Sequence, residues 1–168
     1  MNVDLAQAAL RDAKANPDRF DMAVFWQAPE DFVKDSADMT VPPCGTTGCF
    51  AGFASLRAAP VGTRVVKATI DRSSLIILPG QHADDASDTE EYATRALDIT
   101  PRQAGWLFFL DSIEQVERAV NYLADNPDAS VESLNDAAGG LAVSLSQVRQ
   151  DPQDDDQDEP DEDDWIFE

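Results

Sequence analysis

The stretch CGTTGCFAGFASL, residues 44–56, constrains the fold of this chain more than any other part of the sequence. If a helix begins at its threonines, four small residues share one helical face at spacings of three and four: Gly48, Ala51, Gly52 and Ser55. Such a face has almost no side chains, so another backbone segment can approach it closely. We therefore expect a helix that Thr46 or Thr47 caps and that seats another segment on its bare face.

Cys44 and Cys49, the only cysteines of the chain, allow other interpretations. A zinc site would require His82 and a carboxylate as further ligands, because structural zinc takes four. A disulfide is possible if Cys44 lies outside the helix, since the two Cα atoms must come within about 7 Å. The glycines and threonines between the cysteines also suit a phosphate at a helix start, although the Gly-Lys-Ser/Thr ending of a Walker motif is absent.

Close packing explains more of the residues in this stretch than a ligand does, because a buried free cysteine behaves as a small hydrophobe. The predicted structural motif comprises Cys44, Gly45, Thr46, Gly48, Cys49 and Gly52. We therefore expect no metal and no other cofactor. A Ser-His-Asp triad is not expected either, because the single histidine has no convincing nucleophile beside it in the sequence.

Helical patterns dominate the rest of the chain. Near the first residues, apolar side chains recur at helical spacing: Leu5, Ala6, Ala9, Leu10 and Ala13. Three further helices are expected to begin at residues that cap well: Asp88, Thr100 before Pro101, and Ser112. Residues 131–138 and 141–149 predict two short final helices.

One region has the pattern of a β-sheet. VVKATI and SLIIL are β-branched runs separated by a polar turn, which predicts a β-hairpin over about residues 61–79. The hairpin carries Arg64, Lys67 and Arg72, so it is locally basic. It is a candidate to bind an anion or the acidic tail of the same chain, and a solvated face is the plainer alternative. Residues 27–43 and 80–88 are predicted to be loops.

These patterns together predict an α+β fold that is mainly α-helical, with one β-hairpin. The length of 168 residues suits one domain, since domains span about 100–200 residues. Hydrophobic residues make up 43% of the chain, enough for one core. We expect residues 1–150 to form a single compact domain and residues 151–168 to form a disordered acidic tail.

The net charge of −21 limits which classes of partner can bind the chain. Residues 151–168 contain 11 acidic residues and no Lys or Arg, which leaves −10 on residues 1–150. Direct binding of nucleic acid is disfavoured, because phosphate contacts require clustered Lys and Arg. A basic protein surface is favoured as the partner.

Membrane and export signals are missing from the sequence. No run of about 18 or more apolar residues occurs, so no membrane span is expected. The first residues lack the basic-then-apolar layout of a signal peptide. We therefore expect a cytoplasmic protein with reduced thiols and no membrane partner.

The order of motifs resembles a known group of proteins. CGTTGCFAGFA, then RALDITPRQAGWLFF and then IEQVERAVNYL are similar to the motifs of a family of small uncharacterised proteins from actinobacteria and their phages. That family has a Cys-Gly-Thr-x-x-Cys-Ile/Phe-Ala-Gly helix and a later Leu-Gly-Leu-Thr segment, where this chain has Asp98 and Ile99 in place of Gly-Leu. The resemblance covers residues 5–124. It implies an actinobacterial or phage origin, and it implies no mechanism.

The segment DEDDWIFE resembles a second group, the acidic and aromatic tips of bacterial single-stranded-DNA-binding proteins. Those tips recruit replication and repair enzymes through a basic, apolar pocket. They end in Pro-Phe, whereas Glu168 follows the phenylalanine here. The resemblance implies a docking peptide composed of Asp163, Asp164, Trp165, Ile166 and Phe167. A solubilising tail is the plainer alternative.

The sequence therefore predicts a non-enzymatic, acidic interaction or regulatory protein. In its sharpest form, this is a phage anti-host or anti-defence protein that mimics the charge of DNA on a nucleic-acid-binding host protein. One alternative is a cysteine-based redox or metal-binding enzyme that uses Cys44, Cys49 and His82. Another is a structural or assembly component of a phage.

Overall fold

The computed structural model of the chain describes residues 1–22, 26–27, 31–43, 46–67 and 74–139. Its helices are α1 (Val3–Ala15), α2 (Phe50–Ala58), α3 (Thr89–Leu97), α4 (Pro101–Leu107), α5 (Ile113–Asp125) and α6 (Val131–Ala137), with the 3-10 turns η1 (Pro17–Arg19) and η2 (Ala83–Asp85). Its strands are β1 (Trp26–Gln27), β2 (Phe32–Val33), β3 (Thr47–Gly48), β4 (Arg64–Lys67), β5 (Ser74–Ile77) and β6 (Ser87–Asp88). The predicted α+β fold, mainly α-helical, is confirmed.

The helices other than α2 begin where the sequence offers a side-chain oxygen to the free N–H groups of a first turn. The Asp88 carboxylate accepts hydrogen bonds from the first turn of α3. Thr100 and Gln103 form a reciprocal capping box at the start of α4. Ser112 accepts a hydrogen bond at the start of α5. All three predicted helix starts are therefore confirmed, and so is the amphipathic helix near the first residues, which is α1.

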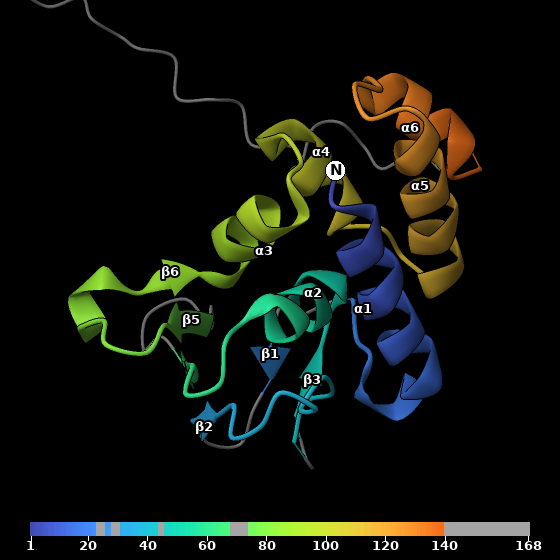
Figure 1. Ribbon diagram of the computed structural model, residues 1–168. Helices are drawn as coiled ribbons and strands as arrows, with labels where there is room; N and C mark the ends of the chain where they lie inside the picture. Colours follow the sequence, from blue (N-terminus) through green and yellow to red (C-terminus); the bar gives the residue numbers. More distant parts are fainter. Residues whose placement is uncertain (23–25, 28–30, 44–45, 68–73, 140–168) are drawn as a thin grey trace, which may run out of the picture.

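Helix α2 occupies the centre of the described part of the chain. It packs against α1 on one side and α3 on the other, and α1 also packs against α5 (Figure 1). Every residue from Phe50 to Leu56 is buried. A helix that is buried all round belongs to the core, so this part of α2 lies in the core between α1 and α3.

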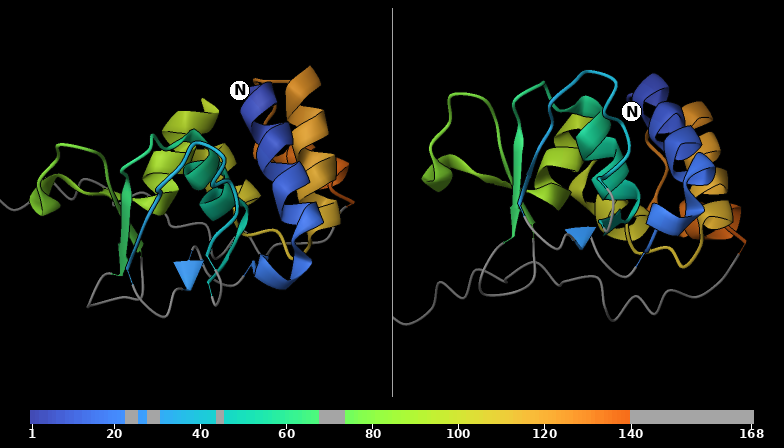
Figure 2. Two further views of the ribbon diagram at one scale, coloured as in Figure 1. Left: turned by 60° about the horizontal axis from the view of Figure 1, so that its bottom comes forward. Right: turned by 90° about the horizontal axis from the view of Figure 1, so that it is seen from below.

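The predicted hairpin forms the middle of an antiparallel sheet with the strand order β2-β4-β5-β6. In its register, Arg64 pairs with Ile77 and Lys67 pairs with Ser74. The helices lie on one side of the β4–β5 pair (Figure 2). Val65 and Ile76 face these helices and are 5% and 1% exposed. The hairpin prediction is confirmed, while its turn over residues 68–73 lies outside the described residues.

Three short strands were not predicted. β2 lies within residues 27–43 and β6 within residues 80–88, and both segments were expected to be loops. β3 pairs with β1 in a separate two-stranded sheet, in the register Trp26 with Gly48. Strands of two residues are too short to show alternation in a sequence, so only their pairing defines them.

Two other predictions concern residues that the structure does not describe. The short helix over residues 141–149 and the acidic tail over residues 151–168 stay predictions, as does the division into a domain and a tail. Among the helices of the described residues, none is both long and apolar enough to cross a membrane.

Candidate functional site

The stretch that was predicted to begin the central helix is divided between a strand and a helix. Gly48 lies in β3, and α2 begins only after Cys49, which is its N-cap residue. Thr46 is 2% exposed, and its N–H donates to the Pro43 carbonyl at 3.0 Å. The prediction that Thr46 or Thr47 caps the helix was therefore wrong. Pairing with β1 holds this segment extended, and tertiary pairing overrides the local cap preference.

Cys49 is a buried free thiol. It is 1% exposed, and burial raises the pKa of its thiol from 9.0 to about 12. The N–H groups of Gly52 and Ala51 act in the opposite direction with a smaller effect. The thiol is therefore protonated at neutral pH, whereas a reactive cysteine requires an accessible thiolate. Its partner in the sequence motif, Cys44, lies outside the described residues together with Gly45.

The third residue of the predicted redox or metal site lies elsewhere. His82 is exposed and precedes η2, in the segment between β5 and β6. Within the described residues, no group of three or more His, Cys, Asp or Glu side chains is arranged to hold a metal ion. The described part of the chain therefore does not bring Cys49 and His82 into one site.

The small residues of α2 do seat another segment. Ala51, Gly52 and Ser55 are all buried. The Ser55 hydroxyl donates to the Thr89 carbonyl at 3.3 Å, and the Thr89 hydroxyl donates to the Ser74 carbonyl at 2.7 Å. These two bonds join α2 to the start of α3 and to β5. The predicted close approach is confirmed at Ser55, although Gly48 does not belong to the helical face.

Lys34 is a buried charged residue of the described part that the sequence analysis missed. It follows β2, and it is 3% exposed. Its Nζ donates to the carbonyls of Leu56 and Ala59, at 2.8 and 2.7 Å. These carbonyls lie at the C-terminal end of α2, where a cation is favoured by the helix dipole. Burial, and then repulsion from Arg57, lower the pKa of Lys34 below its usual value of 10.5.

Backbone pairing places the Lys34 ammonium at this helix end. The Lys34 N–H donates to the Thr63 carbonyl at 2.8 Å, and the Gly62 N–H donates to the Lys34 carbonyl at 2.7 Å. Gly62 has a φ of +91°, a conformation that favours glycine. Lys34 therefore extends the β2–β4 pairing and turns its side chain toward α2. Its role is structural, because both acceptors are backbone carbonyls.

The structure describes the three basic residues of the hairpin to different extents. Arg64 is exposed and pairs across the sheet with Ile77 and Val33. Lys67 ends β4, where only its backbone is described, and Arg72 lies outside the described residues. The predicted binding residues of the tail, residues 163–167, are also outside the described part. The contact between the tail and the hairpin therefore stays a prediction.

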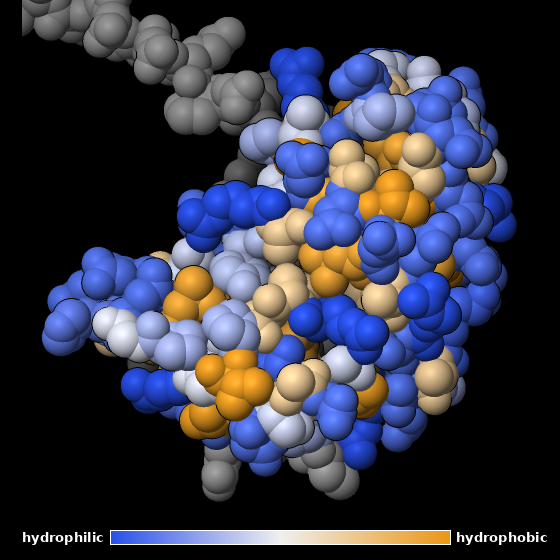
Figure 3. Space-filling view, in the orientation of Figure 1, coloured by the Kyte–Doolittle hydropathy of each residue, from blue (hydrophilic) through white to orange (hydrophobic). Residues whose placement is uncertain are grey.

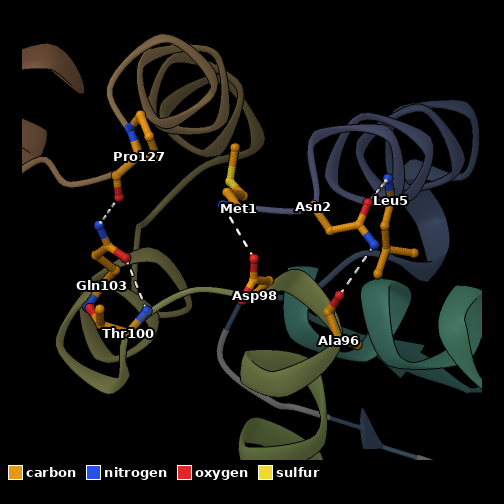
Figure 4. Close-up of polar contacts among 8 residues, drawn as sticks. All are labelled: Met1, Asn2, Leu5, Ala96, Asp98, Thr100, Gln103 and Pro127. Atoms are coloured by element: carbon orange, nitrogen blue, oxygen red, sulfur yellow. Dashed lines mark hydrogen bonds and ion pairs between the residues drawn. The ribbon is translucent and has the colours of Figure 1, made fainter.

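A hydrogen-bonded corner joins the first residues to the link between α3 and α4 (Figure 4). The Asn2 N–H donates to the Leu97 carbonyl at 2.6 Å. Asp98, which ends α3, has a φ of +52°, in the left-handed region where glycine is usual. Its carboxylate is 3.8 Å from the Met1 amino group and is 87% exposed, so this ion pair contributes little to stability.

The same corner extends to the link between α5 and α6. The Gln103 amide donates to the Pro127 carbonyl at 2.8 Å, and its oxygen accepts from the Thr100 N–H at 3.0 Å (Figure 4). Each bond satisfies a backbone group near a helix end. The corner is therefore a joint between helices.

Comparisons with known proteins identify no relative of this chain. No family model, no curated protein and no solved structure matches the chain. The function must therefore be argued from the residues themselves. In the described part of the chain, the buried side chains of Lys34, Ser55, Thr89 and Gln103 join helices and strands, and the carboxylates lie outside the core.

Proposed function

We propose that this chain is a non-enzymatic interaction protein that binds a basic surface of a partner protein and regulates it. The observation that carries this proposal is the placement of charge. The chain has 33 Asp and Glu residues against 12 Lys and Arg residues. None of the acidic side chains in the described residues is buried. They therefore contribute directly to the field that an approaching partner meets.

Several cations of the described part are already occupied. Lys14 pairs with Glu117 at 2.8 Å, and Arg57 pairs with Asp12 at 3.1 Å. Lys34 is buried against backbone carbonyls. These cations are already satisfied by the chain itself, so an anionic partner gains little from them. This arrangement favours a cationic partner and disfavours nucleic acid.

The acidic tail supports the same function. Its charge would accelerate encounter with a basic protein, and this effect would weaken as salt rises. Its aromatic residues, Trp165 and Phe167, would anchor the complex, because tryptophan is enriched at interface hot spots. We propose that the chain acts in the cytoplasm of a bacterial host, as a phage-encoded mimic of DNA charge on a nucleic-acid-binding protein.

Affinity capture from an actinobacterial lysate tests this function. The full chain is compared with two full-length variants, one with Asp154, Asp155 and Asp156 changed to Asn, and one with Trp165→Ala and Phe167→Ala. We expect the full chain to retain basic proteins at low salt and to release them at high salt. The asparagine variant should mainly associate more slowly. The aromatic variant should dissociate faster, at a cost of about 2 kcal/mol or more. Capture that is independent of salt, or of acidic proteins, would contradict the proposal.

A further inference from the structure

One face of the sheet is turned away from the helices and keeps apolar side chains partly exposed. Val65 and Ile76 lie on the face toward the helices. Successive side chains of a strand point to opposite faces, so Val33, Val66, Leu75 and Ile77 lie on the other face. Val33 is 49% exposed, Val66 and Leu75 are half-buried, and Ile77 is buried. We call the three partly exposed residues, Val33, Val66 and Leu75, the outer face.

A further exposed apolar residue lies in the turn before β4. The hydrogen bond from Gly62 to Lys34 places this turn beside the end of β2. Val61, in this turn, is 48% exposed. In Figure 3, hydrophobic surface is visible at the end of the molecule where β2 lies.

Acidic residues lie near the outer face. Asp88 of β6 pairs with Leu75, although its carboxylate accepts hydrogen bonds from the first turn of α3. Asp84 and Asp85 are exposed in the segment that leads from β5 to β6. This segment lies on the side of the strands away from the helices (Figure 2). Arg64 is the cation on this face that the structure describes. Among the described side chains, two exposed carboxylates, Asp84 and Asp85, therefore lie on the side of this face, against one cation, Arg64. We call these two carboxylates the rim.

Charge distinguishes between the possible occupants of this face. The tail of the same chain carries 11 acidic residues, so the rim repels it. A second copy of the chain would bring the same carboxylates against Asp84 and Asp85, which costs free energy. A segment that combines apolar side chains with lysine or arginine is attracted by the rim and buries the centre.

We propose that the outer face binds a basic segment of the partner protein, whose apolar side chains pack on Val33, Val66 and Leu75. Its cationic side chains meet the carboxylates of the rim. This inference rests on the proposed function and names the surface of the folded domain that would carry it. In this proposal, the hairpin contacts a basic segment of the partner and not the acidic tail of its own chain.

The test uses two synthetic octapeptides of equal charge, one alternating Lys with Val and the other alternating Lys with Ser. Each is titrated into the full chain at low salt while the backbone amide resonances are recorded. The Lys–Val peptide should shift the amides of Val33, Val66 and Leu75. Its affinity should exceed that of the Lys–Ser peptide by about tenfold, which equals about 1.4 kcal/mol.

Two exposed residues provide matched variants. Val33→Ser should remove most of the preference for the Lys–Val peptide. Phe109→Ser is the control, because Phe109 is also exposed, at 53%, but lies beyond α4. Equal affinities for the two peptides, or shifts confined to other parts of the chain, would overturn the outer-face proposal and leave the proposed function standing. Failure of both peptides to bind at low salt would overturn both proposals.

Discussion

The two ends of helix α2 are stabilised in different ways. At its N-terminal end, Cys49 and Phe50 are 1% and 0% exposed, and no side-chain hydrogen bond caps the helix. At its C-terminal end, the Lys34 ammonium donates to two backbone carbonyls. Apolar packing therefore defines one end, and charged hydrogen bonds define the other. The difference shows that a helix can be central to a core without conventional caps, provided that neighbouring elements supply what each end lacks.

The largest effect is expected where apolar packing is removed at the N-terminal end. Phe50 packs against Phe108 with ring centroids 6.4 Å apart. Phe50→Ala should lower the free energy of unfolding by about 3–5 kcal/mol, because a buried phenylalanine leaves a cavity. Val33→Ala is the control, since an exposed substitution should stay within about 0.5 kcal/mol. Equal effects of both changes in denaturant unfolding would show that α2 is not the centre of the core.

A smaller effect is expected at the C-terminal end. Lys34→Ala removes two hydrogen bonds and leaves buried carbonyls unsatisfied, which should cost about 2 kcal/mol. Lys34→Met keeps most of the apolar stem and removes the buried charge, so it should cost about 1 kcal/mol. Thermal or denaturant unfolding at neutral pH measures both. If Lys34→Met is as damaging as Lys34→Ala, the packing of the stem does not matter.

Substitutions of Cys49 should lower the free energy of unfolding less than Phe50→Ala or Lys34→Ala. Cys49→Ala should cost about 1 kcal/mol, within the usual range for single substitutions. Cys49→Ser should cost less than Cys49→Ala, because a serine oxygen at the N-cap accepts hydrogen bonds from the first turn and contributes about 1 kcal/mol. The opposite order in unfolding experiments would show that the serine hydroxyl does not cap α2.

The pH dependence of stability should have opposite signs at the two ends. The lowered pKa of Lys34 means that, just below pH 10.5, the unfolded chain holds a proton that the folded chain releases, so stability rises with pH there. The raised pKa of Cys49 means that, from pH 9.0 to about 12, the unfolded chain loses a proton that the folded chain keeps, so stability falls.

Single variants separate these two contributions. In unfolding curves between pH 8 and pH 10.5, Cys49→Ala should remove the falling contribution, and Lys34→Met should remove the rising one. Identical pH profiles for wild type and both variants would mean that neither group is buried as the structure places it.

The starts of the helices show what could be predicted from the sequence and what could not. Asp88, Thr100 and Ser112 were recognised as helix starts because their side chains cap locally and an apolar pattern follows each. Cys49 was missed because Thr46 and Thr47 are better caps in isolation, and only pairing with the distant β1 removes them from the helix. Local propensity could not reveal a competitor from elsewhere in the chain.

The candidate site was harder to predict than the fold. The acceptors of Lys34 are backbone carbonyls, which leave no pattern in a sequence. Alternation along β4 and β5 predicts which residues share a face of the hairpin. The acidic neighbours of that face, however, come from the later segment that holds Asp84, Asp85 and Asp88. Their position depends on the pairing of β5 with a two-residue strand.

The central claim is that the acidic surface of this chain takes the place of nucleic acid on a basic partner. A competition measurement tests it most directly. Labelled duplex DNA is bound to the captured partner, the full chain is added, and the fluorescence anisotropy of the DNA is followed at several salt concentrations. We expect the anisotropy to fall to the value of free DNA, with a midpoint that depends steeply on salt. An anisotropy that stays constant or rises as the chain binds would contradict the claim, because the partner would then hold both at once.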